Sequence, residues 1–331
     1  MKSQGKIFSE IDVDVMRNYF RNKSKKLVSK LTTVKESVSK MIHDGDYIAT
    51  GGFGMIRIPT AILHEIVRQG KKDLVFSGHT STHDCEILAA GKCFNRCDIA
   101  YVIGLEAMGI PKMTRKYFEN EVEYTEWTNS AMSWRLKAAA MGIPFLPVRT
   151  MLGTDTGKYS AAKEIVCPFT GKKLFAVPAL YPDVAIIHVH EADIYGNSHI
   201  KGITVSDIDL ARAAKRVIIT TEKLVPEEFF RNNPANTTIP FPLVDAVIEV
   251  PFGSYPGNMP FEYYLDIKHL QAWLNAEQDI KTYQTFIHEN IFNCIDFNEY
   301  LNLNGGLERM RKLRNIEYLI NMDKENQNGT L

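Results

Sequence analysis

A glycine-rich turn between an apolar run and a proline is the segment best suited to holding a ligand. Residues 44–59 are DGDYIATGGFGMIRIP, in which Gly51, Gly52, Phe53 and Gly54 follow the apolar run. Glycine permits positive φ angles and lets a ligand approach main-chain N–H groups. A helix N-terminus just beyond, opened by the proline, favours negative charge. The pattern predicts an anion or oxyanion site at the carboxyl end of a strand, and a tight turn that needs glycine only for packing fits it equally well.

Two glutamates fall where predicted strands end, so either is a candidate general base. Glu106 follows a predicted strand at residues 99–103, and Glu126 lies at the end of another at residues 123–126. A carboxyl that is desolvated in a pocket has its pKa raised into the range useful for proton transfer. The alternative is that both carboxylates are solvated or paired with Arg115, Lys116 or Arg135.

Other polar residues around these segments are candidates for binding a substrate. Arg57 could hold a carboxylate through two parallel hydrogen bonds, or could be a surface arginine at a helix start. His79, Thr80 and His83 belong to the segment GHTSTHD, residues 78–84. They could hydrogen-bond a substrate, whereas the plainer interpretation is that such loop histidines are solvated.

The composition is that of a globular protein and excludes several classes. The chain has 331 residues with 39 Lys plus Arg and 39 Asp plus Glu, so net charge gives no reason to expect a nucleic-acid or anionic-membrane partner. No apolar stretch approaches the roughly 20 residues that cross a bilayer. The five cysteines are odd in number and scattered, which indicates reduced thiols in a cytoplasmic protein and no metal site.

Strand-like and helix-like segments alternate from residue 34 onward, after a polar, basic extension at residues 1–33. Helices are predicted after Pro59, from Ser130 to Met141, and from Ser206, as N-cap, to Lys215. This alternation predicts one α/β domain, 34–331, with an open, twisted, mainly parallel sheet, helices on both faces and a helical C-terminal region after residue 260. The apolar strand-type runs are residues 47–50, 74–76, 99–103, 145–148, 174–177, 184–189, 217–221 and 246–250.

Residues 44–59 resemble the first motif of family I coenzyme A transferases, which has an Asp-Gly pair, an apolar strand, Gly-Gly-Phe and then a proline. Two positions depart from the general form of that motif. Thr50 stands where an apolar residue is usual, and Arg57 stands where many members carry glycine. An arginine two residues before the proline is typical of glutaconate-type alpha subunits, so the segment is similar to that branch of the family.

Further segments carry the same resemblance in the order found in the family. They are residues 138–147, 177–188 with 192–197, and 209–218. With the glycine segment, the resemblance covers residues 34–250, roughly two thirds of the chain. It implies the superfamily's α/β sheet and an obligate beta subunit of similar fold.

The activity that the resemblance implies is transfer of coenzyme A between an acyl-CoA and a carboxylic acid. Family members use a glutamate that attacks the acyl-CoA and becomes an enzyme–CoA thioester, which is covalent catalysis. In two-subunit members that glutamate belongs to the beta subunit. This chain is then expected to supply the acyl pocket, with residues 51–54 as backbone donors near the thioester oxygen. Coenzyme A is a substrate, no other cofactor is expected, and the assembly is a heterodimer or a heterotetramer.

Two alternatives remain open. Ring-opening hydrolases of steroid degradation resemble glutaconate transferases and are thought to use, as base, a glutamate of their alpha-type chain, a role that Glu126 or Glu106 would fill here. A non-catalytic subunit that only binds acyl-CoA is the other alternative, although a scaffold has no need of the glycine loop. Residues 78–84 also depart from the glycine-rich loop of glutaconate enzymes, which puts glutaconate itself in doubt as substrate.

Overall fold

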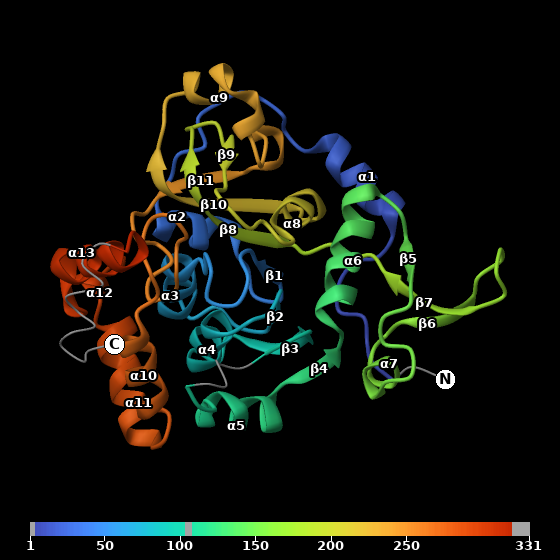
Figure 1. Cartoon of the computed structure of the whole chain (residues 1–331), viewed down its shortest axis with the longest axis horizontal. Helices are drawn as coiled ribbons and strands as arrows, with labels where there is room; N and C mark the ends of the chain where they lie inside the picture. Colours follow the sequence, from blue (N-terminus) through green and yellow to red (C-terminus); the bar gives the residue numbers. More distant parts are fainter. Residues whose placement is uncertain (1–3, 103–107, 320–331) are drawn as a thin grey trace.

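A mainly parallel sheet forms the centre of the chain (Figure 1). The computed structural model describes residues 4–102 and 108–319. Within these ranges the strands of the main sheet are β1 (Tyr47–Thr50), β2 (Leu74–Gly78), β3 (Phe94–Ile99), β4 (Glu123–Glu126), β8 (Val184–Ala192), β9 (Ser198–His199), β10 (Arg216–Leu224) and β11 (Ala246–Glu249). Their order is β11-β10-β8-β1-β2-β3-β4 with every neighbouring pair parallel, and β9 pairs antiparallel with β8. The predicted open α/β fold is confirmed.

Each face of the sheet packs on its own hydrophobic core. Along β1, Ile48 belongs to one core, whereas Tyr47 and Ala49 belong to the other. This alternation follows from the two-residue period of a strand. Because both faces are covered, strands such as β8 are nearly continuous runs of apolar residues. The continuous apolar runs in the sequence and the burial of these strands therefore have the same cause, which is that both faces of the sheet are covered.

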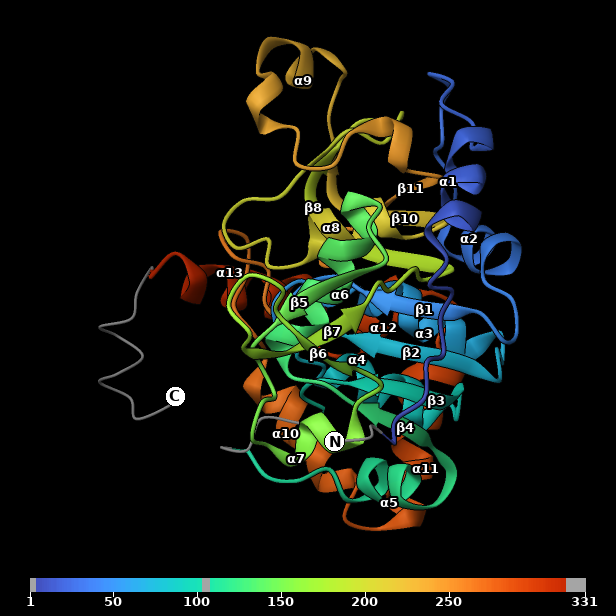
Figure 2. The same ribbon diagram turned by 90° about the vertical axis from the view of Figure 1, so that its right-hand side faces the viewer.

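Helices cover both faces, as predicted (Figure 2). One core receives residues of α2 (Val34–Met41), α3 (Thr60–Arg68), α4 (His83–Ala90) and α5 (Lys112–Glu121). The other core receives residues of α6 (Asn129–Met141) and α8 (Asp207–Ala213). The sheet is thus the middle of three layers.

The ends of α6 and α8 show where the cap predictions hold and where one fails. The Thr128 side chain accepts a hydrogen bond from the Ala131 N–H, and Gly142 ends α6 with a φ of 67°. Ser206 does precede α8, but its side chain makes no capping hydrogen bond. Its Oγ instead lies 3.2 Å from that of Ser133. Ser206 is thus the N-cap residue of α8, as predicted, but the capping hydrogen bond expected of its side chain is missing because the hydroxyl joins α8 to α6.

The strand predicted at residues 99–103 begins earlier in the structure. β3 covers Phe94–Ile99, and residues 103–107 lie outside the described part of the chain. Phe94 and Cys97 are buried, whereas Asn95 is exposed and Arg96 is partly exposed. Because charged and polar residues interrupt this strand, its apolar signal is weaker than that of the run following it.

A second, three-stranded antiparallel sheet lies outside the main one, in the order β5-β7-β6. Its strands are β5 (Phe145–Val148), β6 (Lys163–Val166) and β7 (Lys173–Pro178). The hairpin of β6 and β7 projects from the side of the molecule that carries α6 (Figure 1). Two of the predicted strand runs, residues 145–148 and 174–177, therefore belong to this arm, not to the parallel sheet.

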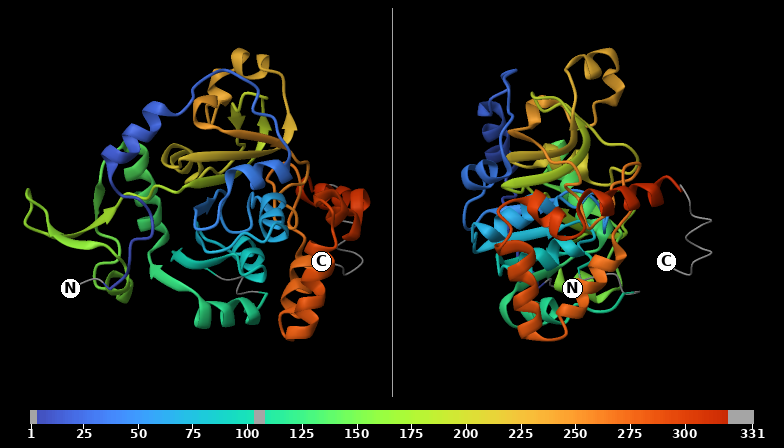
Figure 3. Two further views of the ribbon diagram at one scale, coloured as in Figure 1. Left: turned by 180° about the vertical axis from the view of Figure 1, so that it is seen from behind. Right: turned by 90° about the vertical axis from the view of Figure 1, so that its left-hand side faces the viewer.

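The C-terminal region is helical, as predicted. It contains α10 (Ile267–Ala276), α11 (Ile280–Ile287), α12 (Phe297–Leu303) and α13 (Gly306–Glu317). These helices lie beside α3 and α4 (Figure 3). Trp273 and Tyr300 are fully buried in the same core as α3. The aromatic residues after position 260 thus extend one of the two cores.

The basic N-terminal extension packs along the body of the protein. It includes α1 (Val13–Asn22), whose Met16 is buried in the core shared with α6 and α8. Beyond α1, the Lys23 ammonium donates to the carbonyl oxygens of Lys215 and Leu243 and to Asp245 Oδ2. Three oxygens from the β10–β11 side of the sheet therefore hold this segment in place.

A buried acidic cluster lies between α4 and the C-terminal helices. The Glu86 carboxyl is 2.9 Å from the Nδ1 of His83, whose ring packs edge-on against Trp273. Burial raises the pKa of Glu86 to about 8 and lowers the pKa of His83 to about 3, so near neutral pH this contact is a hydrogen bond between neutral groups. Burial, with Glu86 close by, raises the pKa of Glu277 to about 7.

The Glu86→Gln substitution is expected to make the protein more resistant to heat above pH 8. A carboxyl whose pKa is raised by folding stabilises the native state at low pH, and this stabilisation is lost as pH rises from about 4.5 to about 8. Glutamine keeps the shape of the protonated acid and cannot ionise. The melting temperature of the variant relative to wild type should therefore rise as the pH increases across this window. The control variant Glu119→Gln, on the exposed side of α5, should show a difference from wild type that does not change with pH. A difference independent of pH would contradict burial of an ionisable Glu86.

Candidate functional site

The glycine loop follows β1 at the carboxyl edge of the sheet, as the sequence predicts. Its φ angles are 83° at Gly52 and 60° at Gly54. A Cβ at Gly52 would collide with the Ile56 carbonyl oxygen. The loop therefore needs glycine for its shape. β8 and β2 flank β1 on its two sides, so their ends adjoin the loop.

All four main-chain N–H groups of the loop already have acceptors. Gly51 N–H donates to the Ile186 carbonyl at 2.8 Å, and Gly52 N–H donates to Asp207 Oδ1 at 2.9 Å. Phe53 N–H donates to the Ile56 carbonyl, and Gly54 N–H donates to that of Thr80. A donor role for Gly51, Gly52, Phe53 or Gly54 toward a thioester oxygen stays a prediction, and it requires one of these bonds to be exchanged.

Arg57 forms a buried ion pair that fixes this loop. Its Nη1 and Nη2 donate to the two carboxylate oxygens of Asp207 at 3.0 and 2.7 Å, and Nη2 also donates to the Ile203 carbonyl. Both side chains are fully buried. Because Asp207 also accepts from Gly52, the guanidinium, the carboxylate and the loop form one unit. Arg57 is expected to hold a carboxylate through two hydrogen bonds, and in the structure that carboxylate belongs to Asp207 of the same chain. Binding of a substrate carboxylate by Arg57 stays a prediction.

The backbone at Arg57 has a conformation that glycine adopts more readily than arginine does. Its φ angle is 58°, in the left-handed region that favours glycine. An arginine here accepts backbone strain. The ion pair with Asp207 holds the residue in that conformation.

The other departure from the family motif, Thr50, has a partner of its own. Its hydroxyl donates to Asp84 Oδ2 at 2.8 Å. The other oxygen of Asp84 accepts from the N–H groups of Thr82 and Cys85. A threonine at this position therefore joins the end of β1 to the start of α4.

His79 and Thr80 lie next to the glycine loop. His79 Nε2 is 3.0 Å from the Asn129 carbonyl and 2.8 Å from Ser133 Oγ, and its ring packs on Phe53. Burial lowers the pKa of His79, and its Nδ1 is buried without a hydrogen-bond partner. The Thr80 hydroxyl is also buried without one. Both atoms are shielded from solvent, so the predicted role of His79 and Thr80 in binding a substrate stays a prediction.

The remaining predicted residues are not gathered at the loop. His83 lies in the buried cluster with Glu86, facing Trp273, so its side chain is committed to the core. Glu126 ends β4, the edge strand, three strands from β1. Of the basic residues suggested as its partners, Arg115 pairs with Glu119 and Arg135 pairs with Asp98. Glu106 lies outside the described residues.

A small space adjoins the loop. It has a volume of about 10 Å³ and is lined by residues 49–52, 77–79, Ser206 and Asp207, with three apolar residues of α6 and α8. This is close to the space that one water molecule needs. This space is too small for an acyl group.

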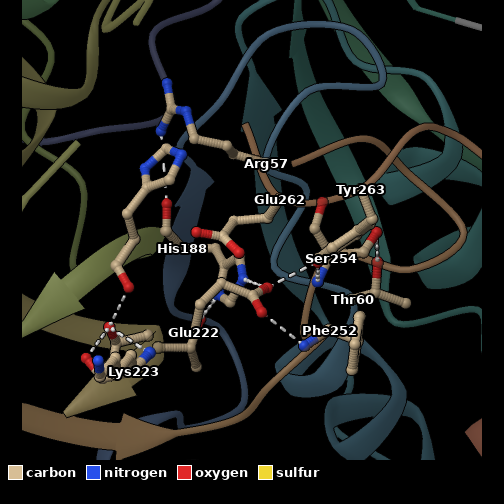
Figure 4. Close-up of polar contacts among 12 residues, drawn as sticks. Arg57, Thr60, His188, Glu222, Lys223, Phe252, Ser254, Glu262 and Tyr263 are labelled. Atoms are coloured by element: carbon tan, nitrogen blue, oxygen red, sulfur yellow. Dashed lines mark hydrogen bonds and ion pairs between the residues drawn. The ribbon is translucent and has the colours of Figure 1, made fainter. Parts of the chain in front are cut away.

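A second polar network holds the neighbouring ends of β8 and β10 (Figure 4). Glu222 contacts His188 Nε2 at 2.8 Å and accepts from the Tyr263 hydroxyl and the Phe252 N–H. The His188 carbonyl lies 3.4 Å from Arg57 Nη1, which joins this network to the loop. Sequence reasoning missed Glu222 and Asp207, because each lies far along the chain from the glycine loop and nothing local marks it.

Two searches bear on other kinds of site. Among the described residues, no group of three or more His, Cys, Asp or Glu side chains is placed to hold a metal ion. None of the helices in that part of the chain is both long and apolar enough to cross a membrane.

The fold and the loop identify the family. Residues 31–250 match the model of the coenzyme A transferase family, and the chain belongs to that family as one component of an enzyme. It is of the type of the glutaconate CoA-transferase alpha subunit. That subunit from Acidaminococcus fermentans is 32% identical over 323 residues, which cover 91% of this chain and 100% of the relative. The crystal structure of the glutaconate coenzyme A-transferase from the same organism superposes with a TM-score of 0.82, covering 86% of this chain and 96% of the matched chain.

Two further relatives have different substrates or chemistry. The corresponding subunit of the 3-oxoadipate CoA-transferase of Pseudomonas knackmussii is 35% identical over 279 residues, which cover 82% of this chain and 97% of the relative. The cholesterol ring-cleaving hydrolase IpdA subunit of Rhodococcus jostii is 26% identical over 260 residues, which cover 74% of this chain and 86% of the relative. Both resemblances expected from the sequence, to transferases and to ring-opening hydrolases, are found.

Replacing Arg57 with alanine is expected to destabilise the protein strongly. The change leaves the Asp207 carboxylate buried without its counter-charge, a situation that typically costs about 3–5 kcal/mol. The double variant Arg57→Met with Asp207→Leu should recover much of this loss, because it buries no unpaired charge. Urea unfolding of the purified chain measures both.

The exposed arginine variant Arg115→Ala is the control and should change the unfolding free energy little, since its pair with Glu119 lies in solvent. Unchanged stability of Arg57→Ala, together with a raised KM for a carboxylic acid substrate, would instead assign Arg57 to substrate binding.

Proposed function

We propose that this chain is the alpha subunit of a two-subunit CoA transferase, which moves coenzyme A between an acyl-CoA and a carboxylic acid. The nucleophilic glutamate is supplied by a beta subunit, and this chain supplies the acyl pocket. The transferase relatives are each named as one of the subunits of their enzyme, which supports a separate partner in a heterodimer or a heterotetramer. Coenzyme A is a substrate here, and the chemistry needs no other cofactor.

The observation that carries this proposal is that the described carboxylates around the loop are all engaged. Asp207 accepts from Arg57 and Gly52, and Asp84 accepts from Thr50 and main-chain N–H groups. Glu222 is bonded on both oxygens. A nucleophile must approach the thioester carbonyl freely. Carboxylates held by several short hydrogen bonds do not meet that need, which favours a nucleophile from outside the chain.

The position of Glu126 also favours this division of labour. β4 is separated from β1 by two intervening strands. At about 4.8 Å between neighbouring strands, the ends of β1 and β4 are roughly 14 Å apart. A base and the groups that bind the reacting carbonyl must lie about 3 Å from neighbouring atoms of the substrate. Glu126 is therefore better placed to contact the far part of an acyl group than to attack at the loop.

The substrate class that fits is a dicarboxylic acid or its mono-CoA thioester. Two of the transferase relatives are named for dicarboxylic acids, glutaconate and 3-oxoadipate. The unpartnered His79 Nδ1 and Thr80 hydroxyl lie beside the glycine loop. A shift of the surrounding segment would expose these two buried atoms as polar contacts for the end of such an acid that does not react.

The test is intact mass spectrometry of the chain purified with its partner and incubated with acyl-CoA. A CoA adduct on the partner, removed when glutaconate or another dicarboxylate is added, is the expected result. Glu126→Gln should keep this adduct, because the residue does not carry the thioester. Arg115→Ala in α5 serves as the control for handling of the complex.

A different pattern would favour the hydrolase or lyase alternative, for which the IpdA relative is the specific support. In that case acyl-CoA is consumed with no CoA adduct on either chain. Activity is also lost in Glu126→Gln or Glu106→Gln. That outcome moves the chemistry from the partner onto this chain.

A further inference from the structure

Residues 252–263, the backing segment, lie against the chain just beyond the glycine loop. The Arg57 N–H donates to the Asn258 carbonyl at 2.8 Å, and the Asn258 N–H donates to the Met55 carbonyl at 2.7 Å. Arg57 is thus held from two sides, because its side chain pairs with Asp207 while its main chain pairs with the backing segment. Its strained backbone depends on both contacts.

The backing segment also holds the first turn of α3. The Ala61 N–H donates to the Gly253 carbonyl at 3.2 Å. The Thr60 hydroxyl donates to the Ser254 carbonyl, also at 3.2 Å (Figure 4). N–H groups in the first turn of a helix have no partner within the helix. Because no side chain caps α3 after Pro59, a carbonyl of the backing segment supplies an acceptor here.

The backing segment is tied to the sheet by Glu222, near the end of β10. Its carboxylate accepts from the Phe252 N–H and from the Tyr263 hydroxyl, each at 2.7 Å. The Tyr263 hydroxyl in turn accepts from the Ser254 N–H at 3.0 Å. Burial, with Glu222 close by, raises the pKa of Tyr263 well above its usual value, so this hydroxyl stays protonated and donates. One carboxylate therefore holds both ends of the segment.

The Glu222 carboxylate is itself fixed by His188. The His188 Nε2 lies 2.8 Å from Glu222 Oε1, and its Nδ1 lies 2.8 Å from Thr220 Oγ1. The Glu222 side chain is only 6% exposed. A carboxylate that is buried and bonded in this way has little freedom to turn toward a substrate, so any effect that it has on the reaction passes through the backing segment.

We propose that Glu222 and Tyr263 are positioning residues for coenzyme A transfer, because they hold the backing segment against residues 55–61 and thereby fix the glycine loop. Neither residue needs to touch a substrate for this role. The effect on the reaction rests on the proposed function, in which the loop binds the reacting carbonyl. The effect on the loop does not, because it follows from the hydrogen bonds alone.

The test uses the chain in complex with its partner and the variant Tyr263→Phe, which removes one hydroxyl and keeps the ring. The kcat for CoA transfer should fall by roughly 10-fold, because a displacement of about 1 Å can cost about 100-fold. KM for the acid should stay unchanged, since the lost interaction is one made in the transition state. Glu222→Ala should slow transfer further, because the Phe252 N–H also loses its acceptor.

The matched control is Tyr117→Phe. Tyr117 belongs to the same hydrophobic core as Tyr263, and its hydroxyl donates to the Phe94 carbonyl, joining α5 to β3. Both variants lose one buried hydrogen bond, so their melting temperatures should fall by similar amounts, whereas kcat should fall only in Tyr263→Phe. Hydrogen exchange, followed by mass spectrometry, should be faster at residues 55–61 and 252–258 in Tyr263→Phe and unchanged there in Tyr117→Phe.

Three results would overturn the proposal. Unchanged exchange at residues 55–61 in Tyr263→Phe would show that this hydroxyl does not hold the loop. An unchanged kcat in an active complex, or an equal fall of kcat in Tyr117→Phe, would remove the role in the reaction. A wild-type complex that forms no CoA adduct counts instead against the proposed function, and the exchange experiment then still decides whether the two residues position the loop.

Discussion

The shape of the glycine loop depends on the ion pair between Arg57 and Asp207. The pair joins residues 150 positions apart, connecting the segment after β1 to the first turn of α8. Taking two charges out of water is unfavourable unless further hydrogen bonds satisfy them. Here the Gly52 N–H and the Ile203 carbonyl supply such bonds. The glycine loop, α8 and the segment that precedes α8 are consequently fixed together, so displacing any one of them disturbs the hydrogen bonds of the others.

The parts of the fold that local pattern controls could be predicted from the sequence. Residues 184–189 and 217–221 could be predicted as the buried parts of β8 and β10, because both runs are rich in valine and isoleucine. α6 could be predicted because Gly142 ends it in a left-handed conformation. The position of the glycine loop at the end of β1 follows from the order of the motif. The resemblance to a transferase family adds the fold of the whole chain and the expectation of a second subunit.

What could not be predicted are the contacts between distant segments. Asp207 lies in an ordinary helix start, and only the folded chain places it against Gly52. His83 looks like a loop residue beside His79, yet α4 begins at His83 and turns its ring into the core against Trp273. The two histidines differ by four positions and occupy unrelated environments. Residue type and spacing establish what chemistry is available, whereas tertiary packing decides which groups remain free to perform it.

The contacts of Lys23 constrain the order in which the chain can fold during synthesis. Its ammonium is held by Asp245, 222 residues further along the chain, and by the carbonyls of Lys215 and Leu243. Because the ribosome makes Lys23 before these partners, its native contacts form only after β10 and the residues before β11 have emerged. Contacts of such long sequence separation slow folding. The segment around Lys23 is therefore synthesised well before the residues that hold it in the native fold.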